Sequence, residues 1–204
     1  MNQKAETDKQ KLAVELDLLK SKLNPHFLFN SLNNIDSLIH SDPEEASAAL
    51  IRLSDIMRYL TYETTSEFVE LRKEVEYIRN FIELYRIRVK SPEGIKLEID
   101  ANLDLKIAPA LFVPLMENAF KFADYRNSKP FINIQLRTSD DRITFDISNF
   151  CRKNSVKPGA INSGYGIINL KKRLELTYPG RHLLKVNHRE LQYDVTLTID
   201  TYAN

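Results

Sequence analysis

A histidine beside amide side chains is the first candidate for chemistry in this sequence. His26 follows Pro25, and Asn30, Asn33 and Ser37 come after it at spacings that place all four polar side chains on one helical stripe. A histidine that titrates near neutral pH can act as a nucleophile, and an amide can orient its ring. His26 is therefore a candidate catalytic residue, with Asn30 as its orienting neighbour. An ordinary solvated helix face is the alternative.

The proline before this histidine changes which side of the helix faces outward. A proline inside a helix costs about 3 kcal/mol and kinks it. The apolar positions before the kink are Leu12, Leu16, Leu19 and Leu23, and those after it are Leu28, Leu32, Ile35, Leu38 and Ile39. The first series is a short heptad seam whose next position would be residue 26. We expect the kink to move His26 off this seam and into solvent.

Three polar side chains interrupt an apolar helix predicted over 110–123. Glu117 and Asn118 are adjacent, and Lys121 follows one turn later. The Asn118 carbonyl oxygen is a ligand type that Mg²⁺ accepts, and Lys121 can reach a phosphate as a point charge. The run suits a metal and phosphate site that includes Glu117. It also suits the polar edge of a buried helix.

Two further groups could bind a nucleotide. Gly164 and Gly166 lead into a predicted helix that carries Asn169, and glycines there let backbone N–H groups approach phosphates at the positive helix end. A plain helix-entry turn is the alternative. Asn149 ends a predicted strand, and its amide oxygen can accept a hydrogen bond from an amine.

The elements that must position these residues divide near residue 92. Residues 1–91 have almost no Gly or Pro and show helical periodicity, with a break and restart at Ser41–Glu45 and a third helix after Val69 and Glu70. After the turn at 91–94, apolar residues alternate in strand fashion. The strands are predicted at 95–99, 131–136, 143–147, 183–186 and 193–199, and the helices at 110–123 and 166–178.

The predicted fold class is α+β. An N-terminal dimerising helical hairpin, residues 1–90, precedes an α/β two-layer sandwich, residues 91–204. The chain has 204 residues, 43% hydrophobic and 28% charged, which excludes a disordered chain. A net charge of +1 argues against direct nucleic-acid binding. The lone Cys151 excludes an internal disulfide and a cysteine-based zinc site, and no apolar run is long enough to span a membrane.

Three motifs resemble the LytS/YehU-type sensor histidine kinases. Residues 23–35, Leu-Asn-Pro-His-Phe-Leu-Phe-Asn-Ser-Leu-Asn-Asn-Ile, resemble the phosphoacceptor box of that family. Residues 114–121 resemble its Pro-Leu-x-Glu-Asn-Ala-x-Lys core, and residues 164–174 its Gly-x-Gly segment. Phe122 stands where the family usually has His. The Asp-x-Gly-x-Gly box is missing, and Asn149 stands about where its Asp should be.

The resemblance implies a Bergerat-type ATP-binding domain that uses ATP and Mg²⁺. It implies that His26 accepts the γ-phosphoryl group and that Asn118 binds the metal. The expected nucleotide-binding residues are Glu117, Asn118, Lys121, Asn149, Gly164, Gly166 and Asn169. The implied partners are a second copy of the chain and the receiver domain of a response regulator, which takes the phosphoryl group on an aspartate. The implied location is the cytoplasmic side of the inner membrane, with membrane segments before residue 1.

Two other functions remain open. The missing Asp-x-Gly-x-Gly box favours a degenerate, kinase-like scaffold that dimerises and docks a regulator without turnover. A chaperone- or topoisomerase-type ATPase shares the ATP-binding fold but does not need the His26 box. Those ATPases usually carry a general-base carboxylate where this chain has Pro114.

Overall fold

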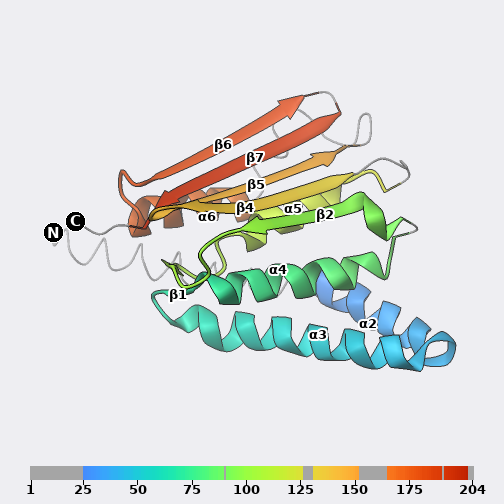
Figure 1. Cartoon of the computed structure of the whole chain (residues 1–204). Helices are drawn as coiled ribbons and strands as arrows, with labels where there is room; N and C mark the ends of the chain where they lie inside the picture. The colour runs from blue at the N-terminus through green and yellow to red at the C-terminus, as the bar shows by residue number, and fades with distance from the viewer. Residues whose placement is uncertain (1–24, 90, 126–130, 152–164, 190, 202–204) are drawn as a thin grey trace, which may run out of the picture.

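A computed structural model describes residues 25–89, 91–125, 131–151, 165–189 and 191–201. A five-stranded sheet in the order β2-β4-β5-β7-β6 forms the upper layer of the molecule (Figure 1). Its strands are β2 (Ile95–Asp100), β4 (Ile132–Ser139), β5 (Arg142–Phe150), β6 (His182–Arg189) and β7 (Gln192–Asp200). Strands β2 and β4 are parallel and the other neighbours are antiparallel, so the sheet is mixed.

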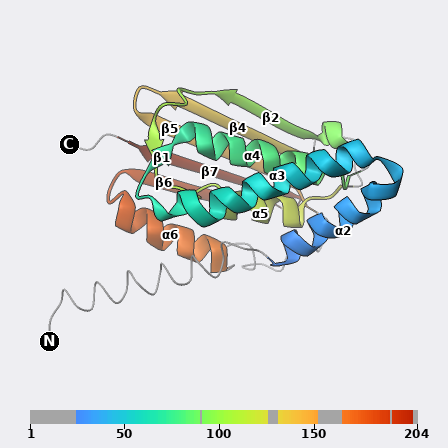
Figure 2. The same cartoon turned by 90° about the horizontal axis from the view of Figure 1, so that it is seen from below.

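Helices cover one face of this sheet in two layers (Figures 1 and 2). Helices α4 (Leu71–Arg86), α5 (Val113–Phe122) and α6 (Tyr165–Thr177) lie against the sheet. Helices α3 (Pro43–Tyr62) and α2 (Pro25–Ser41) lie below them. The predicted α+β fold class, with a helical N-terminal part before a sheet covered by helices, is confirmed.

Short elements link the two helical layers. The 3-10 turn η1 (Glu63–Thr65) precedes β1 (Val69–Glu70), which pairs antiparallel with β3 (Lys106–Ile107). A second 3-10 turn, η2 (Pro92–Gly94), precedes β2. Gly94 is needed there, because a Cβ on it would lie 2.2 Å from the ring of Phe131.

Alternating burial along the strands places the core between the sheet and the helices. The β5 side chains Ile143, Phe145 and Ile147 face the helices, and so do the apolar side chains of β7. Phe145 stacks on Phe112, just before α5, at 4.4 Å between ring centroids. The period of two therefore fixes the buried face of each strand, as predicted. Asn149 is the polar member of the buried β5 series.

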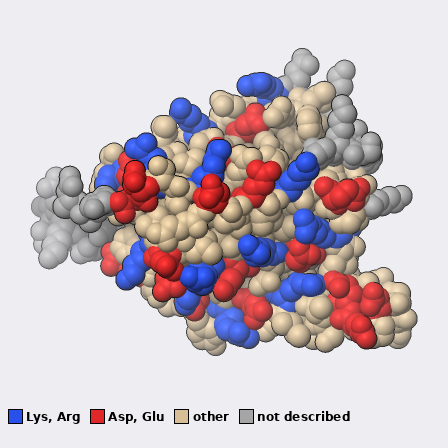
Figure 3. All heavy atoms as spheres, in the orientation of Figure 1, with Lys and Arg blue, Asp and Glu red and all other residues tan. Residues whose placement is uncertain are grey.

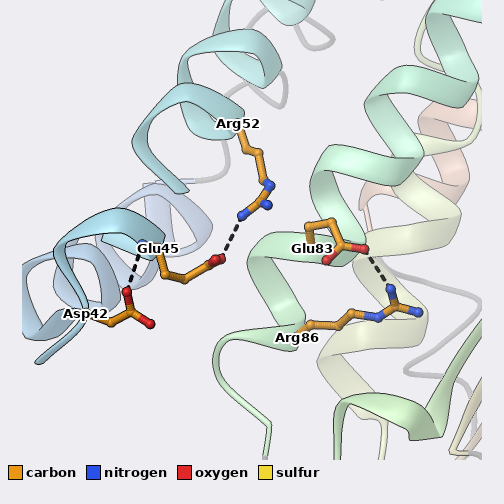
Figure 4. Close-up of polar contacts among 5 residues, drawn as sticks. All are labelled: Asp42, Glu45, Arg52, Glu83 and Arg86. Atoms are coloured by element: carbon orange, nitrogen blue, oxygen red, sulfur yellow. Dashed lines mark hydrogen bonds and ion pairs between the residues drawn. The ribbon is translucent and has the colours of Figure 1, made fainter. Parts of the chain in front are cut away.

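Local capping explains where the helices begin and end (Figure 4). The Asp42 carboxylate accepts a hydrogen bond from the Glu45 backbone N–H at 3.1 Å, and Pro43 fills the first helical position of α3. The predicted break and restart is confirmed. At the end of α4, Arg86 pairs with Glu83 at 2.6 Å and donates to the Ile95 carbonyl at 2.9 Å. Arg86 therefore ties the end of α4 to β2.

Two predictions about the N-terminal part are not tested. The Leu12–Leu23 seam and the kink that joins it to α2 lie outside the described residues. The boundary near residue 90 also stays a prediction. One continuous apolar core joins side chains of α4, such as Ile78 and Phe81, to those of α5 and the sheet.

A buried polar cluster connects α3, α4 and α6 with the segment before α5. The Glu74 side chain is 0% exposed, and its Oε1 accepts from the Tyr59 hydroxyl and from the Ala110 backbone N–H at 2.5 Å. Arg173, on α6, donates to the Pro109 carbonyl. The peptide unit between Pro109 and Ala110 is thus held at both ends.

The hydrogen bonds to the Pro109–Ala110 peptide unit change where the helix predicted from residue 110 begins. Ala110 has a left-handed backbone, with φ of 57°, which costs an alanine about 1–2 kcal/mol. Its N–H donates to Glu74 Oε1 and also to the Tyr59 hydroxyl oxygen at 3.1 Å, and these two hydrogen bonds keep it in that conformation. The helix α5 therefore begins at Val113, and the prediction that it begins at Ala110 is wrong.

Loss of the Tyr59 hydroxyl should destabilise the protein. In Tyr59→Phe the buried Glu74 carboxylate loses a donor, and we expect the free energy of unfolding to fall by about 1–3 kcal/mol. Tyr62→Phe, at an exposed position of the same helix, should change it by less than about 0.5 kcal/mol. Urea unfolding of both variants measures this. Equal effects of the two changes would contradict the role of the Tyr59 hydroxyl.

The same cluster predicts a pH dependence. Burial raises the pKa of Glu74 above its ordinary value of 4.5. The stabilising contribution of this group is therefore complete below about pH 4.5 and is lost as pH rises through the folded-state pKa. The unfolding free energy of the wild type minus that of Glu74→Gln should decline with rising pH, by at most about 1.4 kcal/mol per pH unit. Urea unfolding of both proteins from about pH 5 to pH 8 measures it, and a difference that grows with pH is the contrary result.

Candidate functional site

His26 lies in the first turn of α2 with an exposed side chain. The Asn30 amide nitrogen is 3.1 Å from His26 Nδ1 and 3.2 Å from Nε2. Asn33 and Ser37 are exposed on the same helix. The polar stripe that the sequence predicts is present, and its amide contacts the ring. Because Asn30 is equally close to both ring nitrogens, it can hold the ring without selecting one of them.

His26 shares one cavity with polar side chains of α5. The cavity has a volume of about 460 Å³, which is within the range of about 300–1,000 Å³ for small-molecule sites. Helix α5 contributes Glu117, Asn118 and Lys121 to it. The other lining residues are Phe27, Tyr85, Arg88, Val89, Phe120 and Tyr125. The structure therefore brings together residues that are about 90 positions apart in the sequence.

The charges around this cavity suit a phosphate group. Lys121 and Arg88 are exposed cations on its lining, and each stands over an aromatic ring, Phe122 at 5.3 Å and Tyr85 at 5.2 Å from the ring centroid. Burial raises the pKa of Tyr85 to about 12, with Arg88 opposing the shift, so this hydroxyl is neutral at pH 7. The cavity thus combines two basic side chains with one acidic side chain, Glu117.

The donor set also fits Mg²⁺ when phosphate is present. Asn118 and Glu117 offer oxygen ligands, which Mg²⁺ prefers, and both are half-buried on the cavity wall. Among the described residues, no group of three His, Cys, Asp or Glu is placed to hold a metal ion. The metal would therefore be held by the oxygens of these two side chains together with those of a phosphate.

Asn149 has a buried acceptor without a hydrogen-bond partner. The side chain is 2% exposed, and its Oδ1 is unpaired among the described residues. Tyr193 is its register partner on β7, and the Tyr193 hydroxyl is likewise buried and unpaired among them. The Ala123–Cys151 bridge brings this end of β5 to the end of α5. An orphaned acceptor here fits an amine donor such as that of adenine.

The third predicted motif is described only in part. Gly164 lies outside the described residues. Gly166 is the second residue of α6, where an added Cβ would lie 3.5 Å from Pro114 Cβ in the first turn of α5. The two helix starts therefore pack together. Asn169 is half-buried one turn further along α6.

Residues 14–92 match the family described as histidine kinase. The Sensor protein LytS of Oceanobacillus iheyensis is 31% identical over 128 residues, 62% of this chain and 22% of LytS. The Sensor histidine kinase YpdA of Escherichia coli strain K12 is 36% identical over 106 residues, 52% of this chain and 19% of YpdA. The chain belongs to the LytS-type sensor histidine kinase family. It matches about a fifth of the length of these relatives.

A solved structure described as a bacterial phosphotransferase has a similar fold. It covers 91% of this chain and 96% of its own, with a TM-score of 0.50 and 13% sequence identity. At that identity the likeness concerns the fold alone. It agrees with the mixed sheet and the helical layers of this LytS-type chain.

Sequence reasoning missed six residues on the cavity wall of this LytS-type kinase core, among them Phe27, Tyr85 and Arg88. The aromatic residues of α4 at positions 77, 81 and 85 recur every four residues, which predicts an aromatic stripe. Arg88 follows that stripe by three residues. Arg86, two residues earlier, instead donates to the Ile95 carbonyl. Arg173 donates to the Pro109 carbonyl, which is a structural contact.

Asn149 should set nucleotide affinity if it contacts adenine. Asn149→Asp should tighten ATP binding about tenfold, because a charge-assisted hydrogen bond contributes about 1.5–3 kcal/mol against about 1 kcal/mol for a neutral one. Asn149→Ala should weaken it. Calorimetric titration with a non-hydrolysable ATP analogue and Mg²⁺ measures both.

Asn133→Asp is the matched control for this experiment. It adds the same charge on the opposite face of the sheet, on the neighbouring strand β4. It should leave affinity unchanged. If neither Asn149 variant alters binding while the protein stays folded, Asn149 is not the adenine contact.

Proposed function

We propose that this chain is the kinase core of a two-component sensor. It autophosphorylates on His26 with ATP and Mg²⁺ and then passes the phosphoryl group to an aspartate of a response-regulator receiver domain. The observation that carries the proposal is the shared cavity, where the exposed His26 ring faces the same space as Glu117, Asn118 and Lys121. Membership of the LytS-type family supports a histidine kinase at the family level.

The chain's own residues would act mostly by positioning and charge neutralisation. Bound ATP with Mg²⁺ supplies the phosphoryl group and a counter-charge for it. Asn118 and Glu117 would hold the metal, and Lys121 with Arg88 would attract the phosphate oxygens. Asn30 holds the imidazole ring of His26 in place.

The transfer step balances without a further reactant. A neutral His26 uses the lone pair of its unprotonated ring nitrogen to attack the γ-phosphorus. An N–P bond forms while the P–O bond to the β-phosphate breaks, and ADP leaves with that electron pair. The other ring nitrogen keeps its proton.

We further propose that a second copy of the chain covers the outer apolar side of the helical hairpin. The large exposed apolar side chains of α2 and α3 are Phe29, Leu32, Ile39, Leu50 and Ile51. Their exposed fractions run from 42% to 64%, which is typical of a surface that a partner buries.

The setting of this core within a whole sensor is also a proposal. The chain matches about a fifth of the length of its relatives, so we propose that membrane segments belong to other parts of the protein and that the core works on the cytoplasmic side of the inner membrane. Within the described residues, no helix has both the length and the apolar character needed to cross a bilayer.

A degenerate scaffold is the second candidate function, and two departures from the family pattern favour it. Asn149 lacks the charge of the aspartate that the family carries there, and Phe122 replaces a usual histidine. A scaffold needs no nucleotide, whereas a kinase does. Absence of ATP binding in the calorimetric titration would favour the scaffold.

His26 should be the sole phosphoacceptor. Incubation with radiolabelled ATP and Mg²⁺ should label the wild-type chain and should not label His26→Gln. His40→Gln, exposed at the other end of the same helix and not part of the cavity, should label as the wild type does. The label should be acid-labile and base-stable, as a phosphoramidate is. Label that persists in His26→Gln would contradict the assignment.

A further inference from the structure

Short connections join the helix that carries His26 to the catalytic layer of the same chain. Only Asp42 separates α2 from α3, and its backbone N–H donates to the Leu38 carbonyl at 2.8 Å. From the end of α3, only η1, a short loop and β1 lead to α4. Connections of this length hold consecutive helices beside one another. The path from His26 to α4 is therefore set within one chain.

A column of aromatic rings then joins α2 to α5. Phe27, next to His26 and only 9% exposed, stacks on Phe81 of α4 at 4.9 Å and on Tyr85 at 5.9 Å between ring centroids. Phe81 and Tyr85 in turn contact Phe120 of α5 at 5.3 Å and 4.4 Å. Aromatic pairs at such distances stabilise a contact beyond the burial of their apolar surface. The column anchors the first turn of α2 directly beside the helix that carries Asn118.

The side of α2 that makes this contact is not the side offered to a second copy. At 100° per residue, Phe29 lies 200° from Phe27 around the helix, and Leu32 lies 140° from it. Both are exposed. A dimer that forms through Phe29 and Leu32 therefore leaves the Phe27 contact intact. On the cavity side, His26 and Phe27 face Asn118 and Lys121 of the same chain.

We propose that the phosphoryl transfer to His26 occurs in cis, from nucleotide bound to the same chain, and that Phe27 is the positioning residue for it. This inference rests on the proposed kinase function. The bonds formed and broken are those of the transfer step above. Phe27 does not touch the reacting atoms, and it acts by holding His26 against the cavity wall.

Mixed dimers test the cis assignment. One chain carries His26→Gln and keeps its nucleotide residues. The other carries Asn118→Ala and keeps His26. Co-expression with two affinity tags of different size gives the mixed dimer, which is incubated with radiolabelled ATP and Mg²⁺. We expect no label above that of the two variant homodimers. Label on the Asn118→Ala chain would overturn the proposal.

A second mixed dimer is the matched control. It pairs a wild-type chain with a chain that carries both substitutions, and we expect about half the label of the wild-type dimer, all on the wild-type chain. An unlabelled wild-type dimer contradicts the kinase function itself, and the cis proposal falls with it. If the chain is monomeric, label per chain should be independent of protein concentration, and second-order labelling overturns the proposal.

Phe27 variants test the positioning role. Phe27→Ala should slow His26 labelling at least tenfold, because a displacement of about 1 Å can reduce a rate by about 10². Its affinity for ATP should stay within twofold of the wild type, since Asn118 and Lys121 are unchanged. Phe27→Leu keeps an apolar side chain at the contact and should recover part of the rate. Wild-type labelling by Phe27→Ala, or equal losses in ATP affinity and rate, would overturn this role.

Discussion

The peptide unit between Pro109 and Ala110 is held between the buried Glu74 carboxyl group and the half-buried Arg173 guanidinium, and the placement of α5 depends on it. The Glu74 carboxylate accepts from the Ala110 N–H, and the Arg173 guanidinium donates to the Pro109 carbonyl. Helix α5 begins at Val113 and carries Asn118 one turn later. A buried hydrogen-bonding group that loses its partner costs about 1–3 kcal/mol. The two side chains thus fix one peptide unit from both sides.

Helix α4 is the common reference for both halves of the candidate site. Through Glu74 it holds the segment before α5 and contacts α3, and through Phe81 and Tyr85 it holds the first turn of α2. The proposed acceptor, His26, and the residues proposed for metal and phosphate are therefore positioned by one element. A site that must align a nucleophile with a phosphorus atom benefits from such shared support.

The two groups of residues proposed to bind nucleotide differ in chemistry. The group proposed for phosphate has two cations, Lys121 and Arg88, on the cavity wall. The residue proposed for the base, Asn149, does not line that cavity, and its Oδ1 and the hydroxyl of its register partner Tyr193 are both unpaired among the described residues. Under this proposal, charge would attract the phosphates, while Asn149 would contribute a weaker, neutral hydrogen bond to the base.

Local features of the structure followed from the sequence, because their interactions span only a few residues. The Asp42 cap, the alternation along β5 and β7, and the contact between His26 and Asn30 all depend on neighbours two to four positions apart. The three motifs indicated the family and most of the candidate site residues.

The long-range contacts could not be predicted, because they join residues far apart in the chain. Ala110 is left-handed only because Glu74, 36 residues earlier, binds its N–H. Arg88 and Phe27 meet Asn118 at one cavity only because α2, α4 and α5 pack together. Residue types and their spacing thus determined the chemistry available to this chain, whereas tertiary packing decided which groups share a site.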